Sequence, residues 1–256
     1  MNNRPLILVT NDDGMEAKGL RALIETVRKY GKVVVVAPVE SQSGMSHAIT
    51  VNTPIQVTKT DEKNDVIQYE CSGTPVDCVK IAFNRLLGQK PDLLVSGINH
   101  GSNSSSSIFY SGTMGAALEG CINSVPSIGF SLLNLDPDAD FSASRHFAEK
   151  IIDKVLTNGL PKSICLNVNI PPLPLDSIAG IKVTRQTKGF WKEEFDQHTD
   201  SLGRSYYWLT GFFHNNEPDA PDTDEWALKN NYVSVVPLHV DLTCYDTLKE
   251  IQNWNF

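Results

Sequence analysis

The sequence predicts an α/β fold: a doubly wound, mostly parallel sheet between two layers of helices, followed by a β-rich arm and a tail helix. Two observations lead to this prediction. Through the first 170 residues, short apolar runs typical of strands buried on both faces alternate with segments of helical spacing. After about Pro171 this alternation stops, and a long polar stretch interrupts the remaining strand-like segments.

The chain opens with one strand–helix–strand unit. Leu6–Thr10 is a continuous apolar run and predicts a strand covered on both faces. Apolar residues then recur at helical spacing from Leu20 to Tyr30, and Gly31 is suited to end that helix. Val33–Pro38 is the second buried strand, and a polar loop follows it over residues 40–44.

The next segment predicts a hairpin, a helix and a third parallel strand. Residues 48–70 form a pair of strands with a polar turn over residues 61–64. Thr74 as N-cap, followed by Pro75 in the first turn and Asp77 two residues later, begins a helix that extends to Leu87. The strand after it spans residues 92–96 and leads into Gly97-Ile98-Asn99.

The remaining elements complete the core and then the extension. We expect helices at residues 112–123 and 142–157, and strands at residues 127–132 and 164–168. Residues 181–213 read as strands with a polar excursion over residues 188–204, which is too long for a tight loop and indicates an extended arm or a subunit contact. Acidic residues 217–225 predict a solvated loop. A strand at 232–238 and a tail helix at 242–254 close a single domain of residues 1–256, with a core of about 1–170 and an extension of about 171–256.

Composition narrows the class of protein. The net charge of −8 argues against a nucleic-acid polymer or an anionic membrane as the main partner. Five scattered cysteines without a CxxC pair are typical of a reduced, intracellular protein rather than of a disulfide framework. No apolar run is long enough to span a bilayer, and no signal peptide precedes the first strand. We therefore expect a cytoplasmic protein.

Polar residues gather where the predicted strands end. Asn11, Asp12 and Asp13 follow the first strand, Ser43 follows the second, and Asn99 follows the third. The carboxyl ends of parallel strands form the ligand-binding edge of such sheets. Two adjacent carboxylates repel each other unless a cation lies between them, and an all-oxygen set suits a hard divalent ion. The alternative is that one aspartate caps the next helix, which accounts for only one of the two.

Ser111-Gly112-Thr113 opens a predicted helix and is a candidate phosphate site. Hydroxyls and backbone N–H groups at a helix N-terminus favour a bound phosphate. A simple helix cap remains the alternative. Ser72-Gly73-Thr74 repeats the triplet, but Pro75 removes one N–H there and favours capping.

Several other side chains are candidates with a structural alternative. His47 and His100 flank the proposed loops and could contact a substrate, although a single loop histidine is usually structural. Aromatic residues of the polar excursion could form a platform for a nucleobase, but packing at an interface is the more common role for such side chains. These residues are Trp191, Tyr206, Tyr207 and Trp208.

Six ordered blocks of sequence resemble one known family. They read LVTNDDG, VVAP followed by SG, SGTPVDCV, PDLLVSGINHGSN, YSGTMGAALEG and YVSVVPLHVDLT, and they extend from residue 7 to residue 243. Together they resemble the SurE survival-protein family of metal-dependent 5′-nucleotidases. The resemblance implies a Rossmann-like core, a carboxy-terminal extension used in forming a homodimer or homotetramer, and hydrolysis of nucleoside 5′-monophosphates.

The resemblance also implies roles for single residues. Asp12, Asp13, Ser43 and Asn99 would be the protein ligands of one divalent cation, with Mg²⁺ or Mn²⁺ expected. The phosphate-contacting loop falls on Ser111, Gly112 and Thr113. The chain departs from the family pattern after Asn103, where Ser104–Ser107 replaces an expected glycine and acidic residues.

A mechanism follows as a hypothesis. Asp12 and Asp13 would hold the cation, while Asn11, Ser111 and Thr113 would donate hydrogen bonds to the phosphoryl oxygens and Asn103 would contribute to substrate binding. Asp12 ahead of Asp13 is the candidate general base, and attack by the carboxylate itself stays open.

Three other classes of protein share part of this pattern. A receiver-like signalling module also places two acids after its first strand, but its third strand should end in an acceptor aspartate, where this chain has Ser96 and Asn99. A haloacid-dehalogenase-type phosphatase needs Asp-x-Asp, and a dinucleotide-binding oxidoreductase needs GxGxxG after the first strand. Neither motif is present, so the metal-binding receiver is retained as the alternative.

Overall fold

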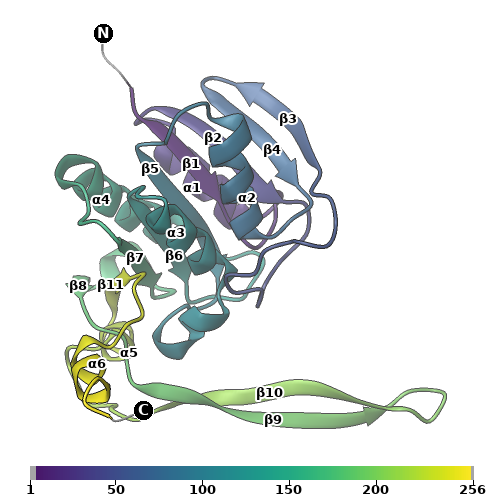
Figure 1. The fold of residues 1–256 in the computed structure, drawn as a ribbon, viewed down its shortest axis with the longest axis vertical. Helices are drawn as coiled ribbons and strands as arrows, with labels where there is room; N and C mark the ends of the chain where they lie inside the picture. The colour runs from purple at the N-terminus through teal and green to yellow at the C-terminus, as the bar shows by residue number, and fades with distance from the viewer. Residues whose placement is uncertain (1–3, 255–256) are drawn as a thin grey trace.

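A nine-stranded mixed sheet with helices on both faces forms the body of the protein, and a two-stranded arm projects from it (Figure 1). The computed structural model describes residues 4–254. The strand order is β3-β4-β2-β1-β5-β6-β7-β11-β8, and every neighbouring pair from β4 to β7 is parallel. The antiparallel pairs β3–β4 and β11–β7 flank this parallel centre. The predicted three-layer, mostly parallel α/β fold is therefore confirmed.

The elements follow one another along the chain with these bounds. The strands are β1 (Leu6–Thr10), β2 (Lys32–Pro38), β3 (Val57–Lys63), β4 (Val66–Cys71), β5 (Leu93–His100), β6 (Ser127–Leu132), β7 (Ile164–Ile170), β8 (Gly180–Val183), β9 (Gly189–Thr199), β10 (Ser205–Asn215) and β11 (Tyr232–His239). The helices are α1 (Lys18–Val27), α2 (Pro75–Ile81), η1 (Ala82–Leu86), η2 (Ser105–Tyr110), α3 (Gly112–Ile122), α4 (Ser142–Asn158), η3 (Leu175–Ser177), α5 (Asp224–Lys229) and α6 (Tyr245–Ile251). Among the described residues, no helix is long and apolar enough to cross a membrane.

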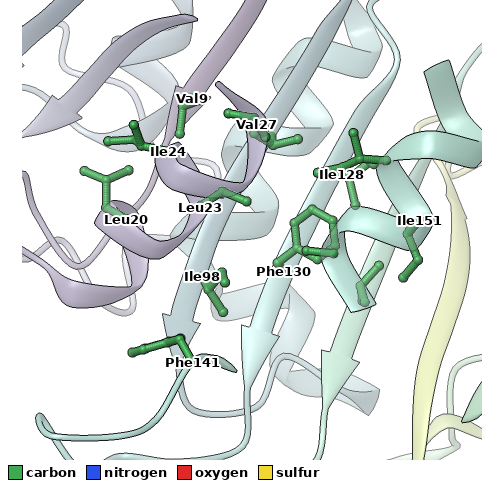
Figure 2. Close-up of a cluster of buried hydrophobic side chains, with 14 of the residues drawn as sticks. Val9, Leu20, Leu23, Ile24, Val27, Ile98, Ile128, Phe130, Phe141 and Ile151 are labelled. Atoms are coloured by element: carbon green, nitrogen blue, oxygen red, sulfur yellow. The ribbon is translucent and has the colours of Figure 1, made fainter. Parts of the chain in front are cut away.

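The continuous apolar run of β1 is explained by two separate cores. Successive side chains of a strand point to opposite faces of the sheet. Ile7 and Val9 accordingly join the core under α1 and α4, whereas Leu6 and Leu8 join the core under α2. Figure 2 shows the first of these cores, and the side chains labelled there are Val9, Leu20, Leu23, Ile24, Val27, Ile98, Ile128, Phe130, Phe141 and Ile151.

Several predicted boundaries are wrong by a few residues or more. The first helix ends at Val27, and residues 48–56 precede rather than form the first strand of the hairpin. The helix that begins at Pro75 leaves α-helical geometry after Ile81 and continues as one π-helical turn, η1. The tail helix spans only Tyr245–Ile251. Most important for the site, β5 continues past the predicted end to His100, so Asn99 lies within a strand.

The polar excursion over residues 188–204 is mostly a strand. β9 pairs with β10 in antiparallel register along the full length of both strands, from Gly189 opposite Asn215 to Thr199 opposite Ser205. The arm stands away from the sheet (Figure 1), so both of its faces are exposed and the strand needs no apolar side. The expected extended arm is confirmed, and its use as a subunit contact stays a prediction.

Residues 217–222 form the exposed or half-buried loop that was predicted for acidic residues 217–225, but the prediction is wrong for residues 223–225, which cap and begin helix α5. Thr223 caps helix α5 by accepting a hydrogen bond from the Trp226 N–H, and Asp224 is only 1% exposed. Its carboxylate accepts hydrogen bonds from the Ser105 N–H at 2.8 Å and from the Thr187 N–H at 2.9 Å. These bonds compensate for the loss of water, which is why an acidic residue is buried here.

Candidate active site

Asp12 is the centre of the candidate site. It lies two residues after the end of β1, at the carboxyl end of the parallel strands, and is 3% exposed. The Thr113 hydroxyl, in the first turn of α3, donates a hydrogen bond to Asp12 Oδ1. The predicted proximity of the first strand end and the Ser111-Gly112-Thr113 triplet is therefore present in the structure.

Gly112 allows this close approach. A Cβ on residue 112 would lie 2.8 Å from the Asp12 Cβ and 3.0 Å from its Oδ2. The same Cβ would lie 3.2 Å from Pro75 Cγ, so the start of α2 also packs beside this point. Because glycine has no side chain, the carboxylate of Asp12 can pack against the N-terminus of α3.

Asp13 is bound to the neighbouring strand. The backbone N–H of His100, at the end of β5, donates to Asp13 Oδ2 at 3.1 Å. Asn99, one residue earlier, uses its amide nitrogen to donate to the carbonyls of His100 and Gly101. Within residues 4–254 this leaves the Asn99 side-chain oxygen without a protein partner.

Ser43 reaches the same edge on an exposed loop. The N–H of Gln42 donates to the Asp12 backbone carbonyl at 2.7 Å, and Ser43 is the next residue. The Ser43 hydroxyl lies 3.0 Å from the Ser41 hydroxyl. The loop is also tied to the segment before α3, because the Ser46 N–H donates to the Tyr110 carbonyl at 3.1 Å. The structure thus brings Asp12, Asp13, the loop that carries Ser43 and the end of β5 that carries Asn99 to one edge of the sheet.

Burial opposes the ionisation of both carboxyl groups, and the charge of Asp13 adds to this effect at Asp12. Burial, followed by the charge of Asp13, raises the pKa of Asp12 to about 6, against a smaller opposite effect of the Thr113 hydrogen bonds. Burial likewise raises the pKa of Asp13, and the His100 N–H partly offsets it. A bound cation between the groups would reverse both shifts.

The donor set fits a hard divalent cation. Its members are the carboxylates of Asp12 and Asp13, the Ser43 hydroxyl and the Asn99 amide oxygen, and oxygen ligands of this kind suit Mg²⁺ or Mn²⁺. Asn11 lies beside them and is 1% exposed. Its amide nitrogen donates to the Gly14 carbonyl at 2.9 Å, but its buried Oδ1 has no partner among the described residues. Unpaired buried polar atoms are rare and point to an unseen ligand or water.

Ser111 is both a helix cap and a candidate phosphate contact. Its hydroxyl oxygen accepts a hydrogen bond from the Met114 N–H at 3.0 Å, so the capping alternative is realised. The hydroxyl hydrogen remains available to donate. The second triplet also caps its helix, because Thr74 and Asp77 form a reciprocal capping box.

Asn103 is hydrogen-bonded to strands β6 and β7. Its amide nitrogen donates to the Ser131 hydroxyl on β6 at 2.8 Å, and its backbone N–H donates to Asn169 on β7 at 2.8 Å. Its carbonyl accepts from Asn167 Nδ2 at 2.7 Å. The structure therefore shows Asn103 as an anchor of the loop that leads to Ser111, and its contact with substrate stays a prediction.

The serine run after Asn103 packs against α5. The Ser104 hydroxyl donates to Glu225 at 2.5 Å, and the Ser105 N–H donates to Asp224. Sequence reasoning missed this contact because it took Asp224 for a solvated residue. The signal that could have revealed it is Thr223-Asp224 before the apolar residues of a short helix, the pattern of an N-cap.

The weaker candidates are placed as structural residues. His47 Nε2 lies 3.1 Å from Glu119 Oε2 on α3, and Lys80 Nζ lies 2.8 Å from the other oxygen of Glu119. The ring of His100 packs edge-on against Phe141 at 5.1 Å. Neither ring bonds to Asp12 or Asp13 within the described chain.

Comparisons with known proteins show which family the chain is similar to. The family described as Survival protein SurE matches residues 7–193. The chain is 51% identical to "5'-nucleotidase SurE" of Flavobacterium psychrophilum, covering 99% of this chain and 98% of the relative, and 54% identical to the same-named protein of Christiangramia forsetii, covering 98% and 97%. A solved structure, the SurE protein from Aquifex aeolicus, superimposes with a TM-score of 0.84 at 41% identity, covering 97% of this chain and 98% of that one. The edge of the sheet that carries Asp12 and Asp13 lies within the matched range, and the chain belongs to the SurE family.

Proposed function

We propose that this protein hydrolyses nucleoside 5′-monophosphates to nucleoside and phosphate at the Asp12–Asp13 edge, with one Mg²⁺ or Mn²⁺ per subunit. One observation carries the proposal: the buried carboxylate of Asp12 packs against the N-terminus of α3, beside a second carboxylate. Anions bind at helix N-termini, and paired carboxylates bind divalent cations. The names of the relatives support the class of substrate.

Four residues would hold the cation: Asp12, Asp13, Ser43 and Asn99. Bound there, it would supply Lewis-acid polarisation of the phosphoryl group. The unpartnered oxygen of Asn99 and the shared position of the two aspartates support this assignment.

Residues of the chain itself would bind and orient the phosphoryl group. The first N–H groups of α3 offer partial positive charge, and the Ser111 hydroxyl can donate while it caps the helix. Asn11 has a second amide N–H beyond the one used on Gly14. Thr113 already donates to Asp12, so its role in this proposal is to fix the orientation of that carboxylate.

Asp12 is the group to which we assign proton transfer from the attacking water. The pKa of about 6 that burial gives Asp12 leaves it mostly ionised at neutral pH, and a bound cation would lower that pKa further. An ionised, oriented carboxylate can act as a general base.

Phosphate release from 5′-AMP, 5′-GMP and an aryl phosphate tests the proposal. Each is incubated with Mg²⁺, Mn²⁺ or chelator, with Asp12→Asn as the active-site variant and the exposed Asp176→Asn as the matched control. We expect release that needs metal, persists in Asp176→Asn and falls at least about a hundredfold in Asp12→Asn. Absence of release with every metal would refute hydrolysis and favour the metal-binding receiver-like module.

A further inference from the structure

A cavity of about 350 Å³ lies between the root of the arm and the residue that precedes the Ser111 triplet. We call it the arm-root slot. It is lined by Tyr110, Trp191, Glu193, Leu209, Thr210 and Gly211. The catalytic assignment above uses none of these residues.

The register of the arm creates the slot. Trp191 and Glu193 are two residues apart on β9 and so lie on the same face. Gly211 stands opposite Glu193 and Leu209 stands opposite Phe195, which places both on that face as well. Because Gly211 has no side chain, the face is hollow between Trp191 and Leu209.

The Trp191 ring is held in place at one side of the slot. Its indole N–H donates to the Ser107 hydroxyl at 3.2 Å, and its ring packs edge-on against Phe213 with centroids 6.3 Å apart. Ser107 belongs to the serine run that departs from the family pattern. The departure therefore has a structural role, since it fixes an aromatic side chain of the arm beside Tyr110.

The slot is within reach of the proposed phosphate site. Tyr110 precedes Gly112 by two residues, a span of at most about 7 Å, and Gly112 packs against Asp12. The Tyr110 side chain is 55% exposed, while its carbonyl is tied to the Ser46 N–H. In a nucleoside 5′-monophosphate only the sugar separates the base from the phosphate, so a phosphate at α3 leaves the base near the slot.

We propose that the arm-root slot is the base subsite of this enzyme and that it prefers guanine. The inference rests on the proposed hydrolysis of nucleoside monophosphates. Any nucleobase can stack on an aromatic side chain, because every base has a π-face. Trp191 and Tyr110 provide the aromatic side chains of the slot. The base is then held by the arm, while the phosphate is held by the sheet edge and α3.

Glu193 provides the preference between purines. Its carboxylate lines the slot and has no hydrogen bond or ion pair within residues 4–254. An ionised carboxylate only accepts hydrogen bonds. Guanine offers two parallel donors, N1–H and the 2-amino group, whereas adenine offers a single amino group and an acceptor nitrogen. The carboxylate therefore favours guanine, and the acceptor nitrogen of adenine would face it unfavourably.

Steady-state kinetics with 5′-GMP, 5′-AMP and ribose 5-phosphate test the proposal, because ribose 5-phosphate lacks the base. We expect Trp191→Ala to raise KM for 5′-GMP about tenfold and to leave ribose 5-phosphate unchanged. Trp191→Phe retains an aromatic face and restores most of the affinity. Phe212→Ala removes an exposed aromatic ring from the opposite face of the arm and is the matched control, which leaves the ratio of kcat/KM for the two substrates unchanged.

The choice of base has its own variant. We expect wild-type kcat/KM to be higher for 5′-GMP than for 5′-AMP by about fivefold or more, and Glu193→Gln to remove most of that difference. Glu194→Gln changes the neighbouring carboxylate, which lies on the other face of β9, and keeps the preference.

Three results would overturn the proposal. The first is a ratio of kcat/KM for 5′-GMP to that for ribose 5-phosphate that is unchanged in Trp191→Ala while hydrolysis is intact. In that case the catalytic proposal still stands. The second is a lower mass of Trp191→Ala in light scattering without a change in its relative kcat/KM for the two substrates. This result would assign the slot to contact with a second copy of the chain. If no substrate is hydrolysed, the catalytic proposal fails, and the subsite is tested separately by quenching of tryptophan fluorescence by guanosine. The third overturning result is quenching that is retained in Trp191→Ala.

Discussion

The position of Asp12 opposes the ionisation of its side chain. Burial and the neighbouring Asp13 both oppose its charge, and together they raise its pKa to about 6. An acid whose pKa is raised on folding contributes most to stability below its unfolded pKa of 3.8, and that contribution is lost as the pH rises through about 6. The metal-free protein is therefore destabilised by this group at neutral pH.

Replacing Asp12 by asparagine is expected to stabilise the metal-free protein. The neutral amide keeps the size of the side chain and avoids the cost of a buried charge, so the free energy of unfolding at pH 7 should rise by on the order of 1–3 kcal/mol. Thermal unfolding in chelator measures it, with Asp176→Asn as the exposed control. A lower melting temperature for Asp12→Asn would contradict the burial argument.

Gly112→Ala tests the contact between α3 and Asp12. The new Cβ would lie 2.8 Å from the Asp12 Cβ, so the helix or the carboxylate must shift. We expect a loss of stability of about 1–3 kcal/mol and a fall in kcat/KM of about tenfold or more. Urea unfolding and phosphate release measure the two effects. Full activity in this variant would show that the close packing is not needed.

At the residue scale, the sequence predicted which side chains converge but not how they bond. Asp12 and Gly112 were recognisable because parallel strands end at one edge and because a glycine opened a helix. The His100 N–H on Asp13 was not predictable, since it depends on β5 running beyond Ser96. Nor was the engagement of Asn103 with Ser131, because such contacts are set by tertiary packing.

At the scale of elements, α5 holds the loop before α3 in position. The Asp224 carboxylate accepts hydrogen bonds from the backbone N–H groups of Ser105 and Thr187, two residues that are far apart in the sequence and both precede it. Thr187 lies two residues before the first strand of the arm. Helix α5 thus connects the serine run, the root of the arm and β11 in one packed unit.

Asp224→Ala is expected to destabilise the protein and to lower activity together. It removes a buried acceptor and leaves at least two N–H groups unpaired, which costs about 3–5 kcal/mol. The matched control is Asp222→Ala, two residues before Asp224. Asp222 is exposed and forms an ion pair with Arg185, so its loss should change stability little. Chemical unfolding separates the two variants, and equal stabilities would contradict the anchoring role.

The Glu119 cluster joins α3 to α2 and to the loop after Ser43, and it should make stability depend on pH. The hydrogen bond with His47 and the ion pair with Lys80 lower the pKa of Glu119 to about 2. An acid with a lowered pKa stabilises the fold above its ordinary pKa of 4.5, and this contribution disappears as the pH falls toward 2.

Comparison of wild type with Glu119→Gln measures this contribution. We expect the variant to be less stable by on the order of 2 kcal/mol at pH 7, with a difference that shrinks between pH 4.5 and pH 2. Urea unfolding across that range gives the values. A difference that is independent of pH would assign the effect to packing rather than to charge.

Elements with a buried face were predicted more accurately than elements without one. β1, β2 and β6 matched within a residue or so, because their side chains are buried on both faces and form apolar runs. β9 has no buried face, so its lysine, two glutamates and aspartate were interpreted as a loop. Helix α5 has only six residues, and a period of 3.6 is difficult to recognise over that length.

At the scale of the whole molecule, the arm exposes large apolar side chains on both of its faces. Phe195 lies on one face and Trp208 on the other, and each is 63% exposed. A two-stranded hairpin is marginally stable in water, and apolar patches of this kind mark association sites. We therefore predict that the arm contacts another copy, in a homodimer or homotetramer.

Light scattering tests that prediction. The wild-type protein should have a mass that is a multiple of 28.2 kDa, and Phe195→Ser combined with Trp208→Ser should lower it. Substituting two exposed polar residues of the arm, Asp196→Asn and Gln197→Ser, provides the control and should leave the mass unchanged. A wild-type mass of 28.2 kDa would refute the assembly.

The extension beyond residue 170 is continuous with the core. β8 and β11 lie in the same nine-stranded sheet as β1, so the separation into a core and an extension is one of composition rather than of architecture. Among the described strands, β9 and β10 lie outside this sheet and form the arm (Figure 1). The change of pattern after Pro171 was visible in the sequence, but the return of the chain to the sheet edge is a long-range pairing that local patterns do not encode.

The bond between Ser105 and Asp224 also bears on the order of events during synthesis. Its two residues are 119 positions apart, and chains leave the ribosome from the amino terminus. Strands β1, β2 and β5, with both aspartates, are translated well before the carboxylate that holds the loop in front of α3. A nascent chain can therefore assemble the sheet edge while the loop in front of α3 is still without its anchor, and the candidate site becomes complete only after α5 has been made.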